Sequence, residues 1–186
     1  MIIILDASTS VTPSNWTKVL NATKELINNM HIDEGWARVG IIEFSNDAMP
    51  VFYLNSFDNK LDMMYNVSHI RYTYGQTNTA AAIWLMRTKM FTKELGDRLH
   101  VPNVAVVLTD GNSTINSRRT IPEAKLAHDA GIEMFAIGVG DADIKELNAI
   151  SGSHERTYFV DHFDDLENLM TTVYVDFCPG KTIYSS

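Results

Sequence analysis

Short apolar runs alternate along the chain with longer segments in which apolar residues recur at helical spacing. The short runs are rich in Val, Ile, Leu and Phe and are bounded by polar residues, Gly or Pro, which is typical of strands buried inside a sheet. This pattern predicts six strands: Ile2–Leu5, Arg38–Phe44, Val51–Leu54, Val104–Leu108, Met134–Val139 and Thr157–Val160.

The intervening segments predict helices. The segment Ile121–Ala130 has Pro122 near its expected first turn and stops at Gly131, a usual pair of start and stop signals. The expected helices are Asn15–Met30, Thr79–Leu95, Ile121–Ala130, Asp143–Ile150 and Asp164–Tyr174. In the first of them, one apolar stripe is formed by Trp16, Val19, Leu20, Thr23, Ile27 and Met30.

This order of elements predicts an α/β fold: a doubly wound, mainly parallel sheet of about six strands with helices on both faces. The connection between Phe44 and Val51 is too short for a parallel crossover, so these strands should form an antiparallel hairpin. Pro50 suits the start of an edge strand. We expect one domain over residues 1–177, followed by a tail or linker over residues 178–186.

Composition narrows the classes of partner. The chain has 186 residues, a mass of 20.9 kDa and a formal net charge of −8, and its basic residues are scattered. Nucleic-acid binding needs a clustered basic surface, so no nucleic-acid partner is expected. No apolar stretch approaches the roughly 20 residues that span a bilayer, and no signal peptide opens the chain. These observations leave a cytosolic protein or a piece of a larger multidomain protein.

Oxygen-bearing side chains follow two of the expected strands and precede one expected helix. Asp6, Ser8 and Ser10 follow the first strand, Asp110 follows the fourth, and Thr77 lies just before the helix that begins at Thr79. Ligands bind beyond the carboxyl ends of strands in such sheets, so these side chains should meet. Oxygen ligands without thiol or imidazole suit Mg²⁺, and Mn²⁺ or Ca²⁺ would fit the same set. Because only two of these ligands are carboxylates, the cation can accept a third carboxylate from a partner.

Several motifs together resemble a von Willebrand factor type A domain with a complete metal-ion-dependent adhesion site. They are Asp6-Ala-Ser-Thr-Ser10, Gly75-Gln-Thr-Asn-Thr79 and Leu108-Thr-Asp-Gly111, and further matches cover nearly the whole chain. The resemblance implies a Rossmann-like fold, a divalent cation held by Asp6, Ser8, Ser10, Thr77 and Asp110, and adhesion to other proteins without catalysis. The secreted matrix branch, such as matrilins, collagen VI and cochlin-like proteins, is the most similar in style.

Two further features favour a secreted protein. Asn-X-Ser/Thr sequons, which mark candidate glycosylation sites, occur at Asn15, Asn21, Asn66 and Asn112. Cys178 is the only cysteine, and the resemblance implies that it is the C-terminal half of a disulfide whose mate would precede the first strand; an inert thiol is the alternative. The expected function is an extracellular matrix or adhesion module that captures a carboxylate of a protein partner, with collagen or another matrix protein as candidates.

Two other functions compete with adhesion. In the first, the metal is mainly structural, and the domain is a matrix or biomineral-associated module that assembles without it. In the second, the strand-end aspartates perform phosphotransfer, but Asp6 is followed two residues later by Ser8 instead of a second acid, and there is no P-loop or nucleophile elbow. Gly138-Val-Gly140 is interpreted as a structural turn, and Glu43 and Asp47 as solvated or packing residues instead of ligands.

Overall fold

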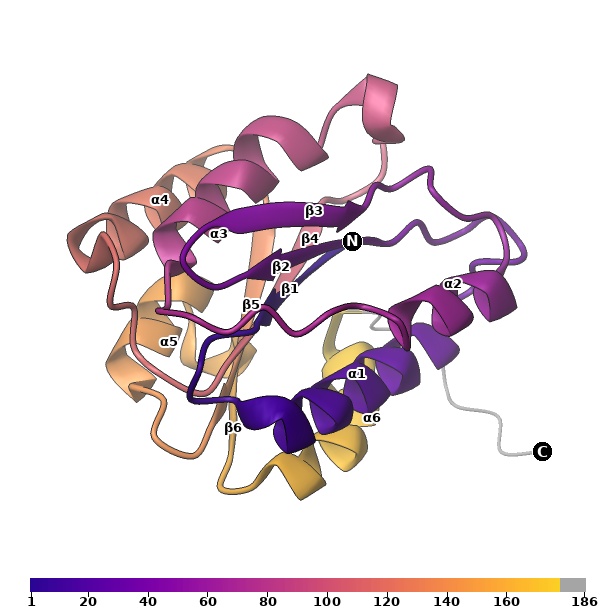
Figure 1. Ribbon diagram of the computed structural model, residues 1–186. Coiled ribbons are helices and arrows are strands. Elements are labelled where there is room, and N and C mark those ends of the chain that lie inside the picture. Colours follow the sequence, from indigo (N-terminus) through magenta and orange to yellow (C-terminus); the bar gives the residue numbers. More distant parts are fainter. Residues whose placement is uncertain (178–186) are drawn as a thin grey trace.

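The structure, a computed structural model, describes residues 1–177 and consists of one six-stranded sheet between two layers of helices (Figure 1). The strands are β1 (Ile2–Asp6), β2 (Gly40–Phe44), β3 (Ala48–Phe52), β4 (Val104–Thr109), β5 (Glu133–Val139) and β6 (Thr157–Val160). Their order across the sheet is β3-β2-β1-β4-β5-β6, and only β3 runs antiparallel to its neighbour. The predicted doubly wound α/β fold and its antiparallel edge strand are confirmed.

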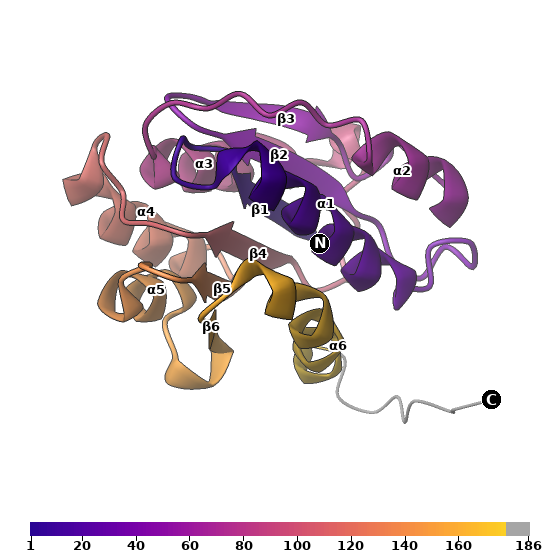
Figure 2. The same ribbon diagram turned by 60° about the horizontal axis from the view of Figure 1, so that its bottom comes forward.

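The helices divide between the two faces of the sheet (Figure 2). They are α1 (Thr12–Asn28), α2 (Lys60–Val67), α3 (Thr79–Leu85), α4 (Ser117–Asp129), α5 (Ile144–Ser151) and α6 (Leu166–Phe177). Because side chains alternate along a strand, Ile3 and Leu5 of β1 pack with α1 and α6, whereas Ile2 and Ile4 pack with α3 and α5. All six residues of the predicted stripe are buried; five lie on α1, and Met30 lies just after its end. Among residues 1–177, no helix is long and apolar enough to cross a membrane.

Several predicted boundaries are wrong for identifiable reasons. The hairpin strand β3 begins at Ala48, not Val51, and Pro50 lies inside it, paired with Ile42. Proline has no backbone N–H, and an edge strand tolerates it because one side of the strand has no neighbour to bond. Helix α4 starts at Ser117, so Pro122 lies within the helix and not near its start. Helix α2 was not predicted, because only Met63 and Val67 of its eight residues are buried.

The predicted helix Thr79–Leu95 is broken into three pieces. Helix α3 ends at Leu85 and passes into a π-helical turn over Met86–Met90, and a short 3₁₀ turn follows over Lys93–Leu95. Met86 and Met90 are both fully buried. The wider turn is one way to keep both methionines in the core, but an Ala- and Met-rich sequence contains no signal for it. The remaining boundaries differ from the predictions by a few residues at most, as expected for helix and strand ends.

Candidate metal centre

Four of the five predicted ligands meet where β1 and β4 end. These two strands are parallel neighbours, paired from Ile2 with Ala105 to Leu5 with Leu108, so their carboxyl ends emerge side by side. Asp6 is the last residue of β1, and Asp110 directly follows β4. Both side chains are largely withdrawn from solvent, with exposed fractions of 0% for Asp6 and 8% for Asp110.

A chain of hydrogen bonds connects the four side chains. The Ser10 hydroxyl donates to Oδ1 of Asp110 at 2.7 Å, and the hydroxyl oxygens of Ser8 and Ser10 are 3.0 Å apart. The backbone N–H of Ser8 donates to Oδ1 of Asp6 at 2.8 Å. The two-residue spacing of the serines therefore directs both hydroxyls toward the same carboxylate edge, as predicted.

Thr77 is held at this edge through its backbone. Its carbonyl oxygen accepts hydrogen bonds from the N–H groups of Thr114 and Ile115 at 2.8 and 3.0 Å, and its own N–H donates to the Thr114 hydroxyl at 2.9 Å. Two residues earlier, Gly75 exchanges two hydrogen bonds with Thr9 in the loop after β1, at 2.9 and 3.0 Å. The structure thus ties Thr77 to the loops that carry the other four residues, but not into their hydrogen-bonded chain.

Thr109 contributes to the site although it was not predicted, and Glu43 is a buried acid near it. The hydroxyl of Thr109, the last residue of β4, donates to Oδ2 of Asp6 at 2.6 Å and fixes that carboxylate from the side opposite Ser8. Glu43, near the end of β2, is buried and accepts a hydrogen bond from Thr73. A polar residue at the end of an otherwise apolar strand was the available signal for both. Glu43 is therefore a packing residue and not a solvated one.

The electrostatics of the edge favour a bound cation. Burial, and secondarily the negative charge of Asp6, raises the pKa of Asp110 to about 6. Burial also raises the pKa of Asp6, against the hydrogen bonds from Thr109 and Ser8. Within residues 1–177, no Lys, Arg or His forms an ion pair with either aspartate. Two buried carboxylates without a cationic partner are costly, and a divalent cation would offset that cost.

The donor set fits Mg²⁺ or a similar hard cation. It consists of carboxylate and hydroxyl oxygens, and the described part of the chain contains no cluster of three or more His, Cys, Asp or Glu side chains that could hold a metal. Two carboxylates balance the charge of a divalent ion, and neutral hydroxyls complete part of its shell.

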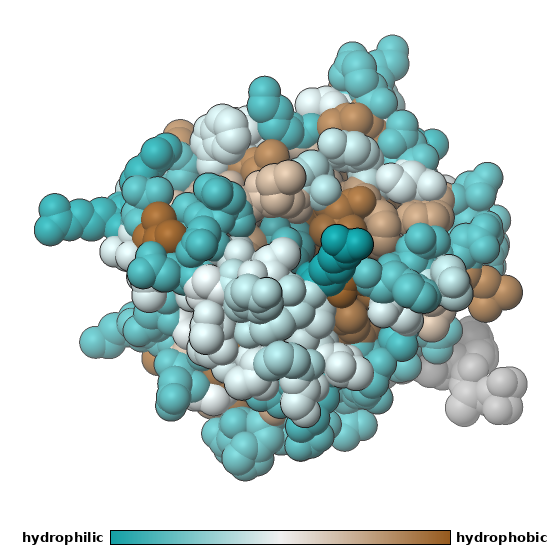
Figure 3. Space-filling model, in the orientation of Figure 1, coloured by the Kyte–Doolittle hydropathy of each residue, from teal (hydrophilic) through white to brown (hydrophobic). Residues whose placement is uncertain are grey.

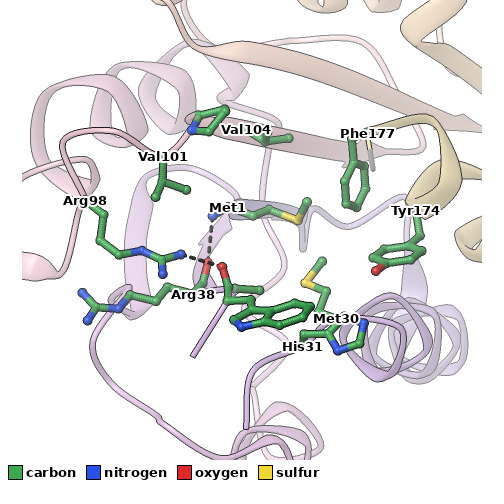
Figure 4. Close-up of a pocket in the computed structure, with 12 residues that line it drawn as sticks. Met1, Met30, His31, Arg38, Arg98, Val101, Val104, Tyr174 and Phe177 are labelled. Carbon is green, nitrogen blue, oxygen red and sulfur yellow. Dashed lines mark hydrogen bonds between the residues drawn. The ribbon is translucent and has the colours of Figure 1, made fainter. Parts of the chain in front are cut away.

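A hollow of about 220 Å³ lies at the opposite end of the sheet, beside the N-terminus (Figure 4). The guanidinium groups of Arg38 and Arg98 line it, and that of Arg98 donates to the Trp36 carbonyl at 2.8 Å. The Met1 amine donates to the Arg38 carbonyl at 2.8 Å, and burial lowers the pKa of this amine to about 5. Apolar side chains such as Phe177 line the rest of the hollow. Figure 3 shows hydrophobic and hydrophilic residues interspersed around this end of the molecule. Such a lining does not suit a cation, so the metal centre is assigned to the other end.

The sequon asparagines lie at different positions. Asn112 is exposed in the loop after β4, near the candidate metal centre, where its Oδ1 accepts from the N–H of Asp143 at 3.0 Å. Asn15 and Asn21 lie in α1 and Asn66 in α2, all three partly buried. Glycosylation at these sites stays a prediction, and Cys178 lies outside the described residues.

The architecture places the chain in a class of doubly wound α/β domains with a polar site at the carboxyl ends of the central strands. Its sequence matches the profile of the von Willebrand factor type A domain over residues 1–172. The chain therefore belongs to the von Willebrand factor type A family, as the motifs predicted.

Named relatives support the same family. The chain is 31% identical over 180 residues to the human collagen alpha-5(VI) chain, covering 96% of this chain and 7% of that one. It is 28% identical to chicken matrilin-3, covering 98% of this chain and 41% of the relative. Proximal thread matrix protein 1 from the mussel byssus, solved with a zinc-occupied metal-ion-dependent adhesion site, superposes with a TM-score of 0.89 at 22% identity, covering 95% and 47% of the two chains. The chain thus spans less than half the length of each.

Proposed function

We propose that this chain is a non-catalytic adhesion or matrix-assembly module of the extracellular matrix. It would hold a divalent cation, with Mg²⁺ expected, through Asp6, Ser8, Ser10, Thr77 and Asp110. The observation that carries the proposal is the hydrogen-bonded chain from Ser8 through Ser10 to Asp110, next to Asp6 at the ends of two adjacent parallel strands. When bound, the cation would supply an electrophilic position for an acidic group of a protein partner.

The protein side chains have separate roles in this proposal. Asp6 is fixed by Thr109 and by the N–H of Ser8, so its position is set before any cation binds. Ser10 is exposed and orients Asp110. A preorganised oxygen set lowers the cost of ordering ligands on binding. The matrix setting is supported by the similarity to collagen VI and matrilin chains, which makes collagen or another matrix protein a reasonable partner.

Calorimetric titration of chelator-treated protein with Mg²⁺, Mn²⁺ and Ca²⁺ tests the metal centre. Asp110→Ala should abolish saturable binding, whereas Asp141→Ala should retain it. Asp141 is a suitable control because it is an exposed carboxylate close enough to influence Asp110 electrostatically. Equal metal binding by the native chain and Asp110→Ala would contradict the assignment.

Adhesion is tested with immobilised fibrillar collagen and with a matrix protein extract. Binding should require the cation, disappear with chelator and with Asp110→Ala, and persist with Asp141→Ala. If the chelator lowers only the melting temperature and assembly continues, the metal is structural, and the proposal of carboxylate capture is wrong.

A further inference from the structure

A groove of about 270 Å³ lies between α3 and the start of α4. Ala80 and Ala81 contribute small side chains, and Trp84 of the same helix stands beside them with 41% of its surface exposed. Asn116 and Arg119, at the start of α4, line the other side. A half-exposed tryptophan beside small residues leaves room for an apolar side chain from another molecule.

The groove and the metal centre share structural support. Helix α3 begins two residues after Thr77, and the segment leading into α4 is bonded to the Thr77 carbonyl through the N–H groups of Thr114 and Ile115. Trp84 lies five residues beyond Thr79, the first residue of α3, which corresponds to roughly 7 to 8 Å along the helix, and Thr77 lies two residues before Thr79. An extended peptide covers about 3.3 Å per residue, so about three to five residues would connect the two positions.

The groove carries positive charge in a chain whose net charge is −8. The single carboxylate of Glu123, which is 5% exposed, is shared by Arg87 and Arg119, each at 3.0 Å. Two guanidinium groups therefore share one negative charge. The side chain of Arg119 is 63% exposed, and a guanidinium has five N–H donors, so it can pair with a further carboxylate.

We propose that this groove is a second subsite for the partner segment that docks at the metal centre. The segment would be extended and would carry an apolar side chain that packs on Trp84 and a second carboxylate that pairs with Arg119. The inference rests on the proposed function, because the first carboxylate is assigned to the cation. Trp and Arg are the residue types that most often dominate binding energy at interfaces.

Synthetic peptides test this inference by NMR on ¹⁵N-labelled protein saturated with Mg²⁺. The first peptide has a glutamate, a leucine and a second glutamate separated by single glycines; two matched peptides replace the second glutamate with glutamine or the leucine with glycine. The full peptide should bind about five- to tenfold more tightly than either control and should shift the Trp84 indole N–H signal.

Protein variants separate this inference from the proposed function. Arg119→Gln should lose the gain from the second glutamate, and Trp84→Ala the gain from leucine, with Mg²⁺ affinity unchanged in both. Lys125→Gln, on the same helix, should behave as the native chain. If Asp110→Ala abolishes peptide binding but the second glutamate gives no gain, the subsite is wrong and the metal function stands. If Asp110→Ala leaves peptide binding unchanged, both the subsite and the proposed metal function are wrong. A Trp84 signal that shifts with protein concentration alone would instead assign the groove to self-association.

Discussion

Ser10 and Asp110 are 100 positions apart in the chain, and the Ser10 hydroxyl donates a 2.7 Å hydrogen bond to Oδ1 of Asp110. The bond forms because β1 and β4 are adjacent and parallel, so the loops that follow them meet. It leaves Asp110 oriented but still buried beside the negative charge of Asp6. The site is therefore suited to a cation, and without one its buried carboxylates destabilise the folded state.

The first prediction concerns Asp110→Asn in metal-free protein. The folded-state pKa of Asp110 is raised from 3.8 to about 6, so ionisation favours the unfolded chain. The cost is absent below about pH 4, grows as pH rises through 6, and is complete above about pH 7. We expect the variant to exceed the native chain in free energy of unfolding by at most about 3 kcal/mol at neutral pH.

Urea denaturation of both proteins between pH 4 and 8, with chelator present, measures this difference. The gap between the curves should widen with pH, and saturating Mg²⁺ should reverse it by stabilising only the native chain. A constant gap would show that Asp110 does not titrate as its surroundings indicate.

The second prediction concerns the buried acid at the end of β2. Burial, and secondarily the charge of Asp6, raises the pKa of Glu43, so its ionisation also opposes folding as pH rises. Glu43→Gln keeps an oxygen acceptor for Thr73 and removes the charge. We expect a stability equal to or above that of the native chain at pH 8, measured by urea denaturation, with a smaller advantage at pH 5.

Thr73→Val is the companion variant. It removes the donor to Glu43 and the contact to the Ser45 hydroxyl at 3.0 Å, leaving buried acceptors unsatisfied. The expected loss is about 1–3 kcal/mol. If Glu43→Gln proves the more destabilising of the two, the charge of Glu43 is compensated by a group other than Thr73.

Much of the fold was predictable because the signals are local. Strand β6 was predicted with its observed bounds, Thr157–Val160, and the apolar stripe of α1 follows directly from helical spacing. The start of β3 was not predictable, because its first residues are half-exposed and a proline such as Pro50 is typical of the start of a strand. The π-helical turn at Met86–Met90 arises in a segment of uniformly high helix propensity, so local sequence contains no sign of it.

The candidate metal centre also has a part that was predictable from the sequence and a part that was not. The proximity of Asp6, Ser8, Ser10 and Asp110 was predictable, because neighbouring parallel strands bring their carboxyl ends to the same edge of the sheet. The contribution of Thr109 was not predicted, because its bond to Asp6 depends on the register between β1 and β4, which the sequence does not specify.

The third prediction concerns Glu123, which joins α4 to the π-helical turn that follows α3 through its ion pair with Arg87. Glu123→Gln would leave the Arg87 guanidinium, whose Nε is already buried without a hydrogen-bond partner in residues 1–177, without its charged acceptor. Breaking a buried pair by removing one partner typically costs about 3–5 kcal/mol. The variant should lose about 3 kcal/mol in free energy of unfolding, measured by urea denaturation.

Asp129→Asn is the matched control, because it breaks an exposed ion pair on the same helix, between Lys125 and Asp129 at 3.3 Å. Its loss should be about 0–1 kcal/mol. Similar losses for both variants would mean that burial does not strengthen the dependence on Glu123.

The fourth prediction concerns Gly138, which lies in β5 and allows α5 to pack closely on the sheet. A Cβ atom at this position would be 2.3 Å from Cδ1 of Leu147 and 3.0 Å from Cβ of Ala142. The glycine is therefore needed for close packing inside β5, and the predicted turn is wrong for Gly138, since only Gly140 of that motif lies in a turn. Gly138→Ala should cost about 2–3 kcal/mol in free energy of unfolding, because overpacking a buried site forces its neighbours apart.

A double-mutant cycle with Leu147→Ala tests the cause. Leu147→Ala alone should cost about 2–4 kcal/mol through loss of buried contacts. In the double variant the new methyl group occupies space that the leucine has vacated, so the combined loss should be smaller than the sum of the single losses by about 1 kcal/mol or more. Additive losses would show that Gly138 is required for another reason. Mg²⁺ affinity should be unchanged throughout, since neither residue is among the proposed ligands.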